Sequence, residues 1–255
     1  MSGSLGSWAW AQRTHGRLRR RDRAQLIRQA ALAQLAQLPG PWRRALLGEK
    51  LSLTLPAPPD SALARSAQER VAELSTAGLY AHCERTWLFA TLFAQRDRIA
   101  HDEELLYLTC ILHDIGLTEP HNHVEPAAQC FAVEGARAAY RLLLGQGEHE
   151  DRALTVAEAI CMHLNITVPR SAGGEAHLVN KGAMLDVIGR YANELPAASM
   201  HQVLERWPRA GLSEGLLAPS LAQAQTRPHS RVAFMQRLPK AAERVAANPL
   251  NRIGV

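Results

Sequence analysis

Helix-length segments whose apolar residues recur along one face constrain this chain more than any other feature. The first runs over residues 22–38. Ala, Leu, Arg and Gln are the dominant residues and runs of β-branched residues are rare, a composition that favours helices. Further helices are predicted over 63–75, 79–96, 102–113, 130–145, 150–164 and 177–194. No convincing strand is found, so an all-α helical bundle is predicted.

Pro- and Gly-containing breaks divide the chain. LPAPPD at 55–60 is predicted to be a linker or a strap wrapped on the surface, and residues 119–129 a loop. Residues 197–255 carry five prolines and should form short helices joined by turns. The interpretation is a basic N-terminal helical extension with a linker, a main helical domain, and a C-terminal helical segment packing on that domain: 1–60, 61–196 and 197–255.

The positive charge is concentrated at the N-terminal end. The formal net charge is +5, but residues 1–50 carry +8 and the remainder −3. The run RLRRRDR at 17–23 could contact nucleic acid or an acidic surface, although a solvated helix face is the commoner meaning of such a run. Because no aromatic stacking platform or nucleic-acid motif accompanies the run, a nucleic-acid partner is not expected.

Cysteine usage and hydropathy indicate a compartment. The chain has four cysteines and no CxxC pair, which predicts buried free thiols in a reducing environment. The N-terminus lacks an apolar core typical of a secretory signal. Since no apolar stretch of about 20 residues occurs, no membrane span is predicted and a cytoplasmic protein is expected.

Five polar residues stand out because they lie on apolar helices. ILHDIG ends one such helix with His113 and Asp114 side by side, and Asp186 lies inside GAMLDVIG. A carboxylate among apolar neighbours is costly to bury unless it is paired or binds a cation. His82 and His163 lie on further apolar helices. Singly, such residues are more often structural, but imidazoles and carboxylates in an ordered set suit Zn, Fe, Ni or Mn.

The ordered set H…HD…D resembles the signature of the HD-domain superfamily of metal-dependent hydrolases. Residues 78–194 cover it: GLYAHCERTW supplies the first His, CILHDIG the His-Asp pair and GAMLDVIGRY the final Asp. HxxR at 82–85, Gly116 and the Gly-Ala at 135–136 are similar to further features of the superfamily. FAVEGARAA, AICMH and EAHLVNKGAMLDVIG resemble the branch that includes cyanamide hydratase. The resemblance implies an HD-domain helical bundle with N- and C-terminal helical extensions.

The resemblance also implies a cofactor and its ligands. It assigns one divalent transition metal, with zinc expected and iron, nickel or manganese as alternatives. The implied ligands are His82, His113, Asp114 and Asp186.

A mononuclear centre is predicted from residue 131. Dinuclear members of the superfamily place a ligand histidine four positions before the Gly of an H-x-x-x-G-A segment, and this chain has Phe131 there. A phenylalanine cannot coordinate a cation. His163 matches another dinuclear ligand, and without a partner at 131 it is assigned to substrate binding or proton transfer. His121 or His123 could still recruit a second metal.

The implied activity is that of a hydrolase or hydratase (a hydro-lyase) in which the metal activates water. Asp114 is assigned to orient or deprotonate the water, and His163 or Glu134 to donate a proton. Glu134 could equally be a surface carboxylate. Arg85, Lys181 and Phe131 are the candidate substrate-binding residues.

The substrate is expected to be a small nitrile-like molecule of the cyanamide type, or a related nitrogen compound. A phosphohydrolase would need several cationic side chains around a dianion, and Arg85, Arg137, Lys181 and Arg190 do not form an obvious phosphate cradle. Two alternatives stay open: a phosphohydrolase acting on a nucleotide or phosphate ester, and a non-catalytic HD-fold binding module. The C-terminal segment could cap the pocket or form the interface of a homo-oligomer.

Overall fold

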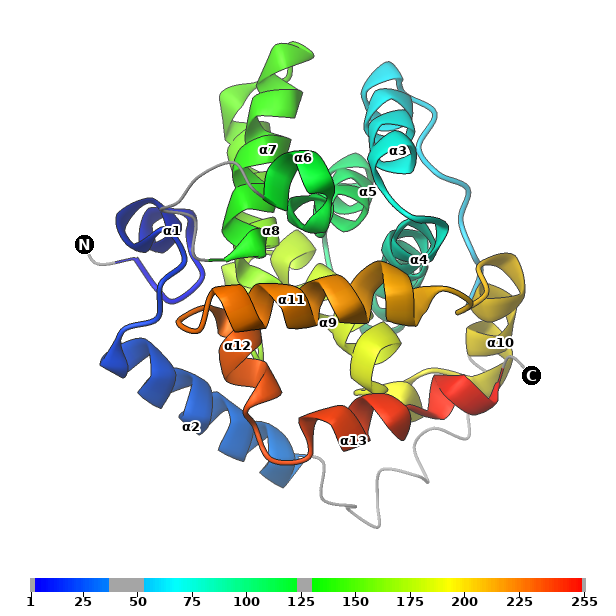
Figure 1. Cartoon of the computed structure of the whole chain (residues 1–255). Helices are drawn as coiled ribbons and strands as arrows, with labels where there is room; N and C mark the ends of the chain where they lie inside the picture. Colours follow the sequence, from blue (N-terminus) through cyan, green and yellow to red (C-terminus); the bar gives the residue numbers. More distant parts are fainter. Residues whose placement is uncertain (1–2, 37–52, 123–129, 254–255) are drawn as a thin grey trace.

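The computed structural model describes residues 3–36, 53–122 and 130–253, and every regular element in these ranges is helical. The predicted all-α fold is therefore confirmed. Figure 1 shows the helices arranged as a bundle, with the C-terminal helices lying across one side of it and the N-terminal helices at one edge. None of the described helices is both long and apolar enough to cross a membrane. The four cysteines are free and buried.

The bundle is built around helix α4 (Ala77–Asp97), which is buried on nearly all sides. A helix that is apolar around its whole circumference must lie inside a protein. Helix α4 packs against α5 (Glu103–Leu112) and, most extensively, against α9 (Gly174–Ile188). Helix α5 is also buried over most of its length. The motif-bearing helices therefore form the core itself.

Helices α4 and α9 approach each other closely at Gly182. A Cβ atom on Gly182 would lie 2.3 Å from the backbone oxygen of Thr86, so no larger residue fits without moving the helices apart. Thr86 lies one turn after His82, and Gly182 lies one turn before Asp186. The close crossing therefore brings His82 and Asp186 to the same level of the bundle.

Five further helices surround this core. Helix α7 packs on α8, α8 packs on α5 and α9, α3 packs on α5, and α1 packs on α8. Their bounds are α1 Trp8–Thr14, α2 Arg20–Ala36, α3 Ala62–Leu74, α7 Phe131–Gly145 and α8 Glu150–Met162. Before α3 the chain runs without regular structure, and Thr54 exchanges two backbone hydrogen bonds with the side chain of Gln95 on α4.

The C-terminal segment consists of short helices, as its prolines predict. Helix α10 contacts α4 and α13 contacts α9, while α11 and α12 contact each other. In Figure 1, α11 crosses in front of α9, and α13 lies below α9 in the view. The bounds are α10 Ala197–Arg206, α11 Ala218–Thr226, α12 Arg231–Gln236 and α13 Ala241–Ala246.

Helix ends differ from the predictions in two places. Helix α9 ends at Ile188 rather than near 194, because Gly189 adopts a left-handed φ of +67° and donates its N–H to the Leu185 oxygen. A single helical turn, α6 (Glu119–Asn122), lies in the predicted loop 119–129. Pro120 is tolerated there because the first turn of a helix does not need its N–H. Residues 37–38 of the first predicted helix lie outside the described residues.

Candidate metal centre

His82 lies at the centre of the candidate site. It lies on helix α4 and is completely buried, and its Nδ1 is 2.6 Å from Oδ2 of Asp186. Burial alone would raise the pKa of Asp186, but the charge of Arg85 and the hydrogen bond with His82 hold that pKa well below its usual range. An ionised carboxylate can only accept a hydrogen bond, so Nδ1 of His82 is the donor. When the ring is neutral, its Nε2 therefore carries a lone pair.

His113 directly follows α5 and is also fully buried. Its Nδ1 donates a hydrogen bond to the backbone oxygen of Cys110 at 2.7 Å. A carbonyl oxygen only accepts, so Nε2 of His113 also carries a lone pair whenever this ring is neutral. The two Nε2 atoms of His82 and His113 are 3.2 Å apart. If both rings are neutral, two lone pairs face each other at this distance, so the pair favours a proton or a metal ion between them.

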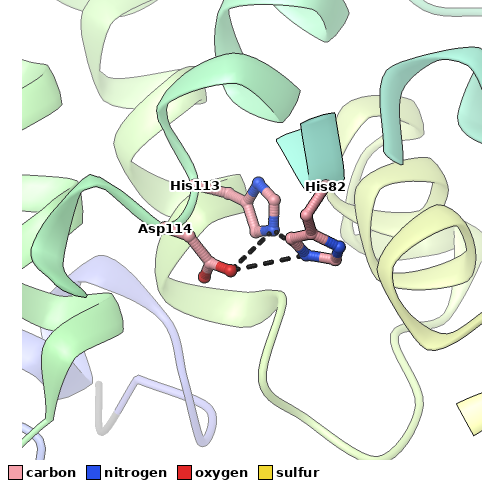
Figure 2. A group of neighbouring side chains, drawn as sticks. All are labelled: His82, His113 and Asp114. Carbon is pink, nitrogen blue, oxygen red and sulfur yellow. Dashed lines mark hydrogen bonds and ion pairs between the residues drawn. The ribbon is translucent and has the colours of Figure 1, made fainter. Parts of the chain in front are cut away.

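Asp114 adds a third acceptor to the same point. Its Oδ2 lies 3.4 Å from Nε2 of His82 and 3.3 Å from Nε2 of His113, and Figure 2 shows the three side chains pointing toward one another. The ligand atoms of the three residues all lie within 4.8 Å of one another, and all three residues are buried. Buried acceptors that face each other without a donor are destabilising unless a cation lies between them. The cluster therefore fits a metal ion, with the residue types that divalent transition metals prefer.

The pKa of His113 shows how strongly the cluster attracts positive charge. Burial alone would lower this pKa, but the charge of Asp114 and its hydrogen bond outweigh burial and raise the pKa to about 10. The Asp114 pKa is correspondingly held well below its usual range, against the effect of burial, chiefly by the charge of His113. A proton and a metal ion therefore compete for the same group of lone pairs.

His163 and Phe131 border the cluster on the other side of Asp114. His163 directly follows α8, its Nδ1 donates to the backbone oxygen of Ile160 at 2.7 Å, and its Nε2 is 3.4 Å from Oδ1 of Asp114. Burial lowers the pKa of His163, so this ring is neutral with its Nε2 lone pair facing Asp114. The Phe131 ring centroid is 6.0 Å from that of His163.

Gly116 explains why Phe131 lies so close to the site. A Cβ atom on Gly116 would lie 2.0 Å from the backbone oxygen of Phe131. The turn that follows Asp114 can therefore contact the first residue of α7 directly. This contact places the aromatic ring of Phe131 beside His163.

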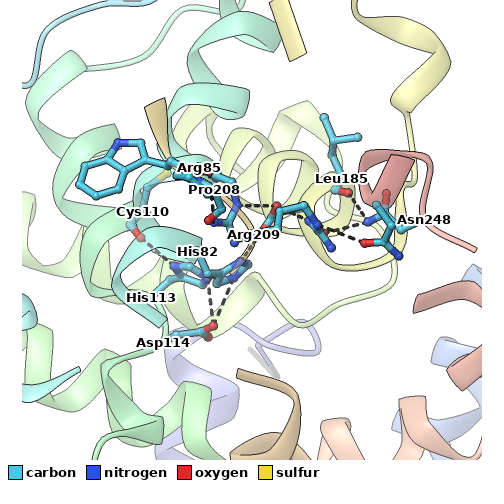
Figure 3. Close-up of polar contacts among 12 residues, drawn as sticks. His82, Arg85, Cys110, His113, Asp114, Leu185, Pro208, Arg209 and Asn248 are labelled. Carbon is cyan, nitrogen blue, oxygen red and sulfur yellow. Dashed lines mark hydrogen bonds and ion pairs between the residues drawn. The ribbon is translucent and has the colours of Figure 1, made fainter. Parts of the chain in front are cut away.

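Asp186 lies next to His82 but outside the three-residue cluster. It contacts Nδ1 of His82, the ring nitrogen directed away from His113 and Asp114. Arg85, which is fully buried, binds it through two hydrogen bonds, Nε to Oδ1 at 2.8 Å and Nη2 to Oδ2 at 2.9 Å. Figure 3 shows Arg85 and Arg209 on the side of His82 away from Asp114.

Two other predicted site residues make their contacts elsewhere. Oε1 of Glu134 accepts a hydrogen bond from Arg137 at 2.8 Å, and Arg137 also contacts His15 of the N-terminal segment. Lys181 is bound by two carboxylates, Asp97 at 3.1 Å and Glu194 at 2.9 Å. Among the described contacts, neither Glu134 nor Lys181 interacts with His82, His113 or Asp114.

Of the two candidate ligands for a second metal, only His121 is described. It is half-buried in α6, and burial together with the charges of Arg70 and Arg141 lowers its pKa. His123 lies outside the described residues.

Sequence reasoning did not anticipate two residues that reach Asp186. Arg209 donates to Oδ1 of Asp186 at 2.6 Å, and Asn248 donates to its backbone oxygen at 2.8 Å. Both lie in the C-terminal segment, and neither is part of a recognisable spacing pattern. Only the folded arrangement shows that they belong to the site.

Comparison with known proteins agrees with this geometry. Residues 79–195 match the family model of the HD domain, so this chain carries an HD domain. It is also 27% identical over 156 residues to two proteins of Saccharomyces cerevisiae, cyanamide hydratase DDI2 and cyanamide hydratase DDI3. The alignment covers 60% of this chain and 68% of each relative. The resemblance inferred from the H…HD…D set is thereby confirmed.

Proposed function

We propose that this protein is a mononuclear metal-dependent hydratase or hydrolase that adds water to a small nitrile-like compound of the cyanamide type. The observation that carries the proposal is the convergence of three buried acceptor atoms, from His82, His113 and Asp114, on one point. The names of the two yeast relatives support the choice of substrate class. The proposal rests on the site and not on fold class alone, because a fold can host many functions.

His82, His113 and Asp114 would hold the metal, and zinc is the metal we propose. Three protein ligands leave an open coordination position, the arrangement found in catalytic zinc sites. The bound metal supplies Lewis acidity, which activates water at neutral pH and polarises an electrophile. Position 131, where dinuclear members of the superfamily have a ligand histidine, holds a phenylalanine whose ring lies next to His163, which supports a single metal.

Asp114 and His163 would move the proton. Oδ1 of Asp114 has no hydrogen-bond partner in the part of the chain that the structure describes, so it can orient a water molecule and accept its proton. Nε2 of His163 lies 3.4 Å from that oxygen and can take the proton on. In hydration of a nitrile, the water oxygen bonds to carbon while the proton passes from Asp114 through His163 to nitrogen. Glu134 has no part in this scheme, because it is engaged by Arg137.

The charges around the site favour a neutral substrate over a phosphate ester. A phosphate dianion needs cationic donors directed at it. Arg85 is bound to Asp186 and Lys181 to Asp97 and Glu194. Arg137 is bound to Glu134 and His15, and Arg190 donates to the Ile166 oxygen. These engagements are inconsistent with the cationic cradle that the phosphohydrolase alternative requires.

Metal analysis combined with a substrate panel tests the proposal. Purified protein should contain close to one equivalent of transition metal per chain, and it should release urea from cyanamide. Small nitriles and phosphate esters form the rest of the panel, with ammonia and phosphate release as readouts. Phosphate release without hydration of any nitrile would overturn the substrate class, and two equivalents of metal would overturn the mononuclear assignment.

His113→Ala tests the ligand assignment directly. The variant should lose both the metal and the activity, because the alanine removes one of three ligands. His201→Ala is the matched control, since His201 is exposed on α10 and pairs only with the neighbouring Glu205 in the described contacts. A His113→Ala protein that retains a full equivalent of metal would show that the assignment is wrong.

A further inference from the structure

The carboxylate of Asp186 has no lone pair left for a cation. Its Oδ1 accepts from Nε of Arg85 at 2.8 Å and from Nη1 of Arg209 at 2.6 Å. Its Oδ2 accepts from Nη2 of Arg85 at 2.9 Å and from Nδ1 of His82 at 2.6 Å. A carboxylate offers about four lone-pair positions, and here four donors take them. Two guanidinium groups also more than neutralise its single negative charge.

Asp114 differs from Asp186 in each of these respects. Its Oδ1 has no hydrogen-bond partner within the described ranges, and its ion-pair contacts are with the rings of His82, His113 and His163. Asp114 thus keeps a free lone pair on Oδ1, and its described ion-pair contacts are with imidazole rings rather than with a guanidinium, so it can still bind a divalent cation. The two buried carboxylates of the site have different environments, so different roles are expected for them.

His82 connects the two carboxylates. Its Nε2 faces the cluster, while its Nδ1–H is bound to Asp186. A histidine that binds a metal through one nitrogen commonly donates its other N–H to a carboxylate, which fixes the tautomer and makes the ring a stronger ligand. His113 and His163 instead donate to backbone carbonyls. Among these three rings, His82 is the one oriented by a charged partner.

The C-terminal segment holds Asp186 in this position. Arg209 donates to the backbone oxygen of Asp186 as well as to its side chain, and Asn248 donates to the same backbone oxygen at 2.8 Å. The oxygen of Pro208 accepts from Nη1 of Arg85 at 2.7 Å, so the segment also holds the second arginine (Figure 3). All three residues lie beyond the matched HD domain, which ends at residue 195.

We infer that Asp186 is a positioning residue that orients His82 through its Nδ1–H, rather than a metal ligand, and that Arg209 completes the site by fixing Asp186. The metal is then held by His82, His113 and Asp114 within the protein. This inference deepens the proposed function and rests on the metal site proposed there. It also makes the C-terminal segment a part of the site and not merely a cover for it.

Cobalt(II) binding by two variants tests the inference. In Asp186→Asn the amide oxygen can still accept from His82, so one Co²⁺ should bind with the visible spectrum and the X-ray absorption ligand count of the wild type. Its affinity should fall about 10- to 100-fold, as is typical when the partner of a metal-ligating histidine is altered. Arg209→Gln should lower the affinity in the same direction by a smaller factor. Arg206→Gln is the matched control, because Arg206 lies three residues earlier with an exposed side chain.

Nitrogen NMR of the histidines gives a readout that a merely structural role would not move. In the wild-type protein the His82 ring should carry its proton on Nδ1, and that proton should resonate far downfield because of the short bond to Asp186. In Asp186→Asn and in Arg209→Gln this resonance should move upfield. The measurement on the wild type alone remains informative if a variant does not fold.

The possible results are distinguishable. Loss of one oxygen ligand from the Co²⁺ of Asp186→Asn, or a wild-type His82 that carries its proton on Nε2, would overturn the positioning role. Arg209→Gln that behaves like Arg206→Gln would overturn the part played by the C-terminal segment. Wild-type protein that binds no metal would instead refute the proposed function. A loaded, active wild type with Asp186 among the ligands would refute this inference only.

Discussion

At the scale of single residues, the direction of each hydrogen bond identifies which atoms can bind a cation. His82, His113 and His163 each commit Nδ1 to an acceptor, a carboxylate for the first and backbone oxygens for the other two. The same side of each ring is therefore occupied, and each Nε2 is directed toward Asp114 or its neighbours. The chemistry of the site follows from these three donor bonds, because they decide where the lone pairs are.

His163→Gln should separate proton transfer from metal binding. Glutamine cannot relay a proton at neutral pH, so we expect kcat to fall about 10²- to 10⁴-fold, the usual effect of losing a general acid or base. Metal content should stay close to one equivalent, because His163 is not among the three clustered ligands. Elemental analysis and turnover of cyanamide by the same preparation check both parts. Loss of the metal together with activity would make His163 a ligand.

Glu84 gives a prediction about pH and stability. It is buried, and Oε1 accepts from the hydroxyl of Tyr80 at 2.9 Å. Burial is the main reason that its pKa lies above the ordinary value of 4.5. A group whose pKa is raised in the folded state stabilises the protein below the unfolded pKa, and this contribution is lost as the pH rises through the folded pKa.

Glu84→Gln should therefore raise the melting temperature at pH 7.5 and change it little at pH 4.5, since the amide needs no proton to be neutral. Thermal unfolding at the two pH values measures this, and Glu69→Gln on the exposed face of α3 is the control. If the variant is less stable than the wild type at pH 7.5, the carboxylate is stabilised by its partners more than it is penalised by burial.

At the scale of helices, apolar periodicity predicted which segments are helical because burial of one face stabilises most protein helices. Local sequence did not predict where α9 ends, although Gly189 could have suggested it, since the left-handed turn there depends on the glycine φ of +67°. The apolar periodicity could not predict the role of Gly182 either. A glycine inside a helix has no local advantage, and its reason is a contact with α4.

Gly182→Ala should destabilise the protein and weaken metal binding together. The added Cβ would lie 2.3 Å from the Thr86 oxygen, so the helices must move apart. Overpacking of this kind costs about 1–3 kcal/mol. The same movement would separate His82 from Asp186. Urea denaturation and Co²⁺ titration measure the two effects.

Gly145→Ala is the control for this substitution, because a Cβ there meets nothing within 4 Å. It should be neutral or stabilising by up to about 1 kcal/mol, the helix preference of alanine over glycine. If both variants unfold at the wild-type urea concentration, the α4–α9 crossing does not depend on a glycine.

At the scale of the whole molecule, contacts between distant parts of the chain decide what the sequence could not predict. The spacing H…HD…D selected four residues, but it could not show which nitrogen of His82 faces which carboxylate. Arg209 and Asn248 lie 23 and 62 residues after Asp186, and such contacts leave no local pattern. The resemblance to the HD domain identified the region of the site, and tertiary structure supplied the partners of its members.

The N-terminal segment and helix α12 meet around one buried guanidinium. Arg231 of α12 is fully buried and donates to the backbone oxygen of Cys161 and to Oδ1 of Asn165 at 3.2 Å. Asn165 in turn donates to the backbone oxygen of Leu5 at 2.8 Å. The ring of Trp10 lies 5.1 Å from the centre of the guanidinium. The first residues of the described chain are therefore part of the core. Asn165, which binds them, lies two residues after His163 in the sequence.

Trp10→Ala tests whether the N-terminal segment stabilises the whole molecule. Trp10 is 1% exposed, so the substitution would leave a large cavity beside a buried cation that has also lost its aromatic partner. Replacement of a buried tryptophan by alanine costs about 3–5 kcal/mol. Trp8→Ala is the comparison, because Trp8 is only half-buried against Tyr140 and should cost clearly less. Urea denaturation followed by circular dichroism measures both. If the two variants lose the same stability, the N-terminal helix is an attachment to the bundle and the contact with Arg231 does not support it.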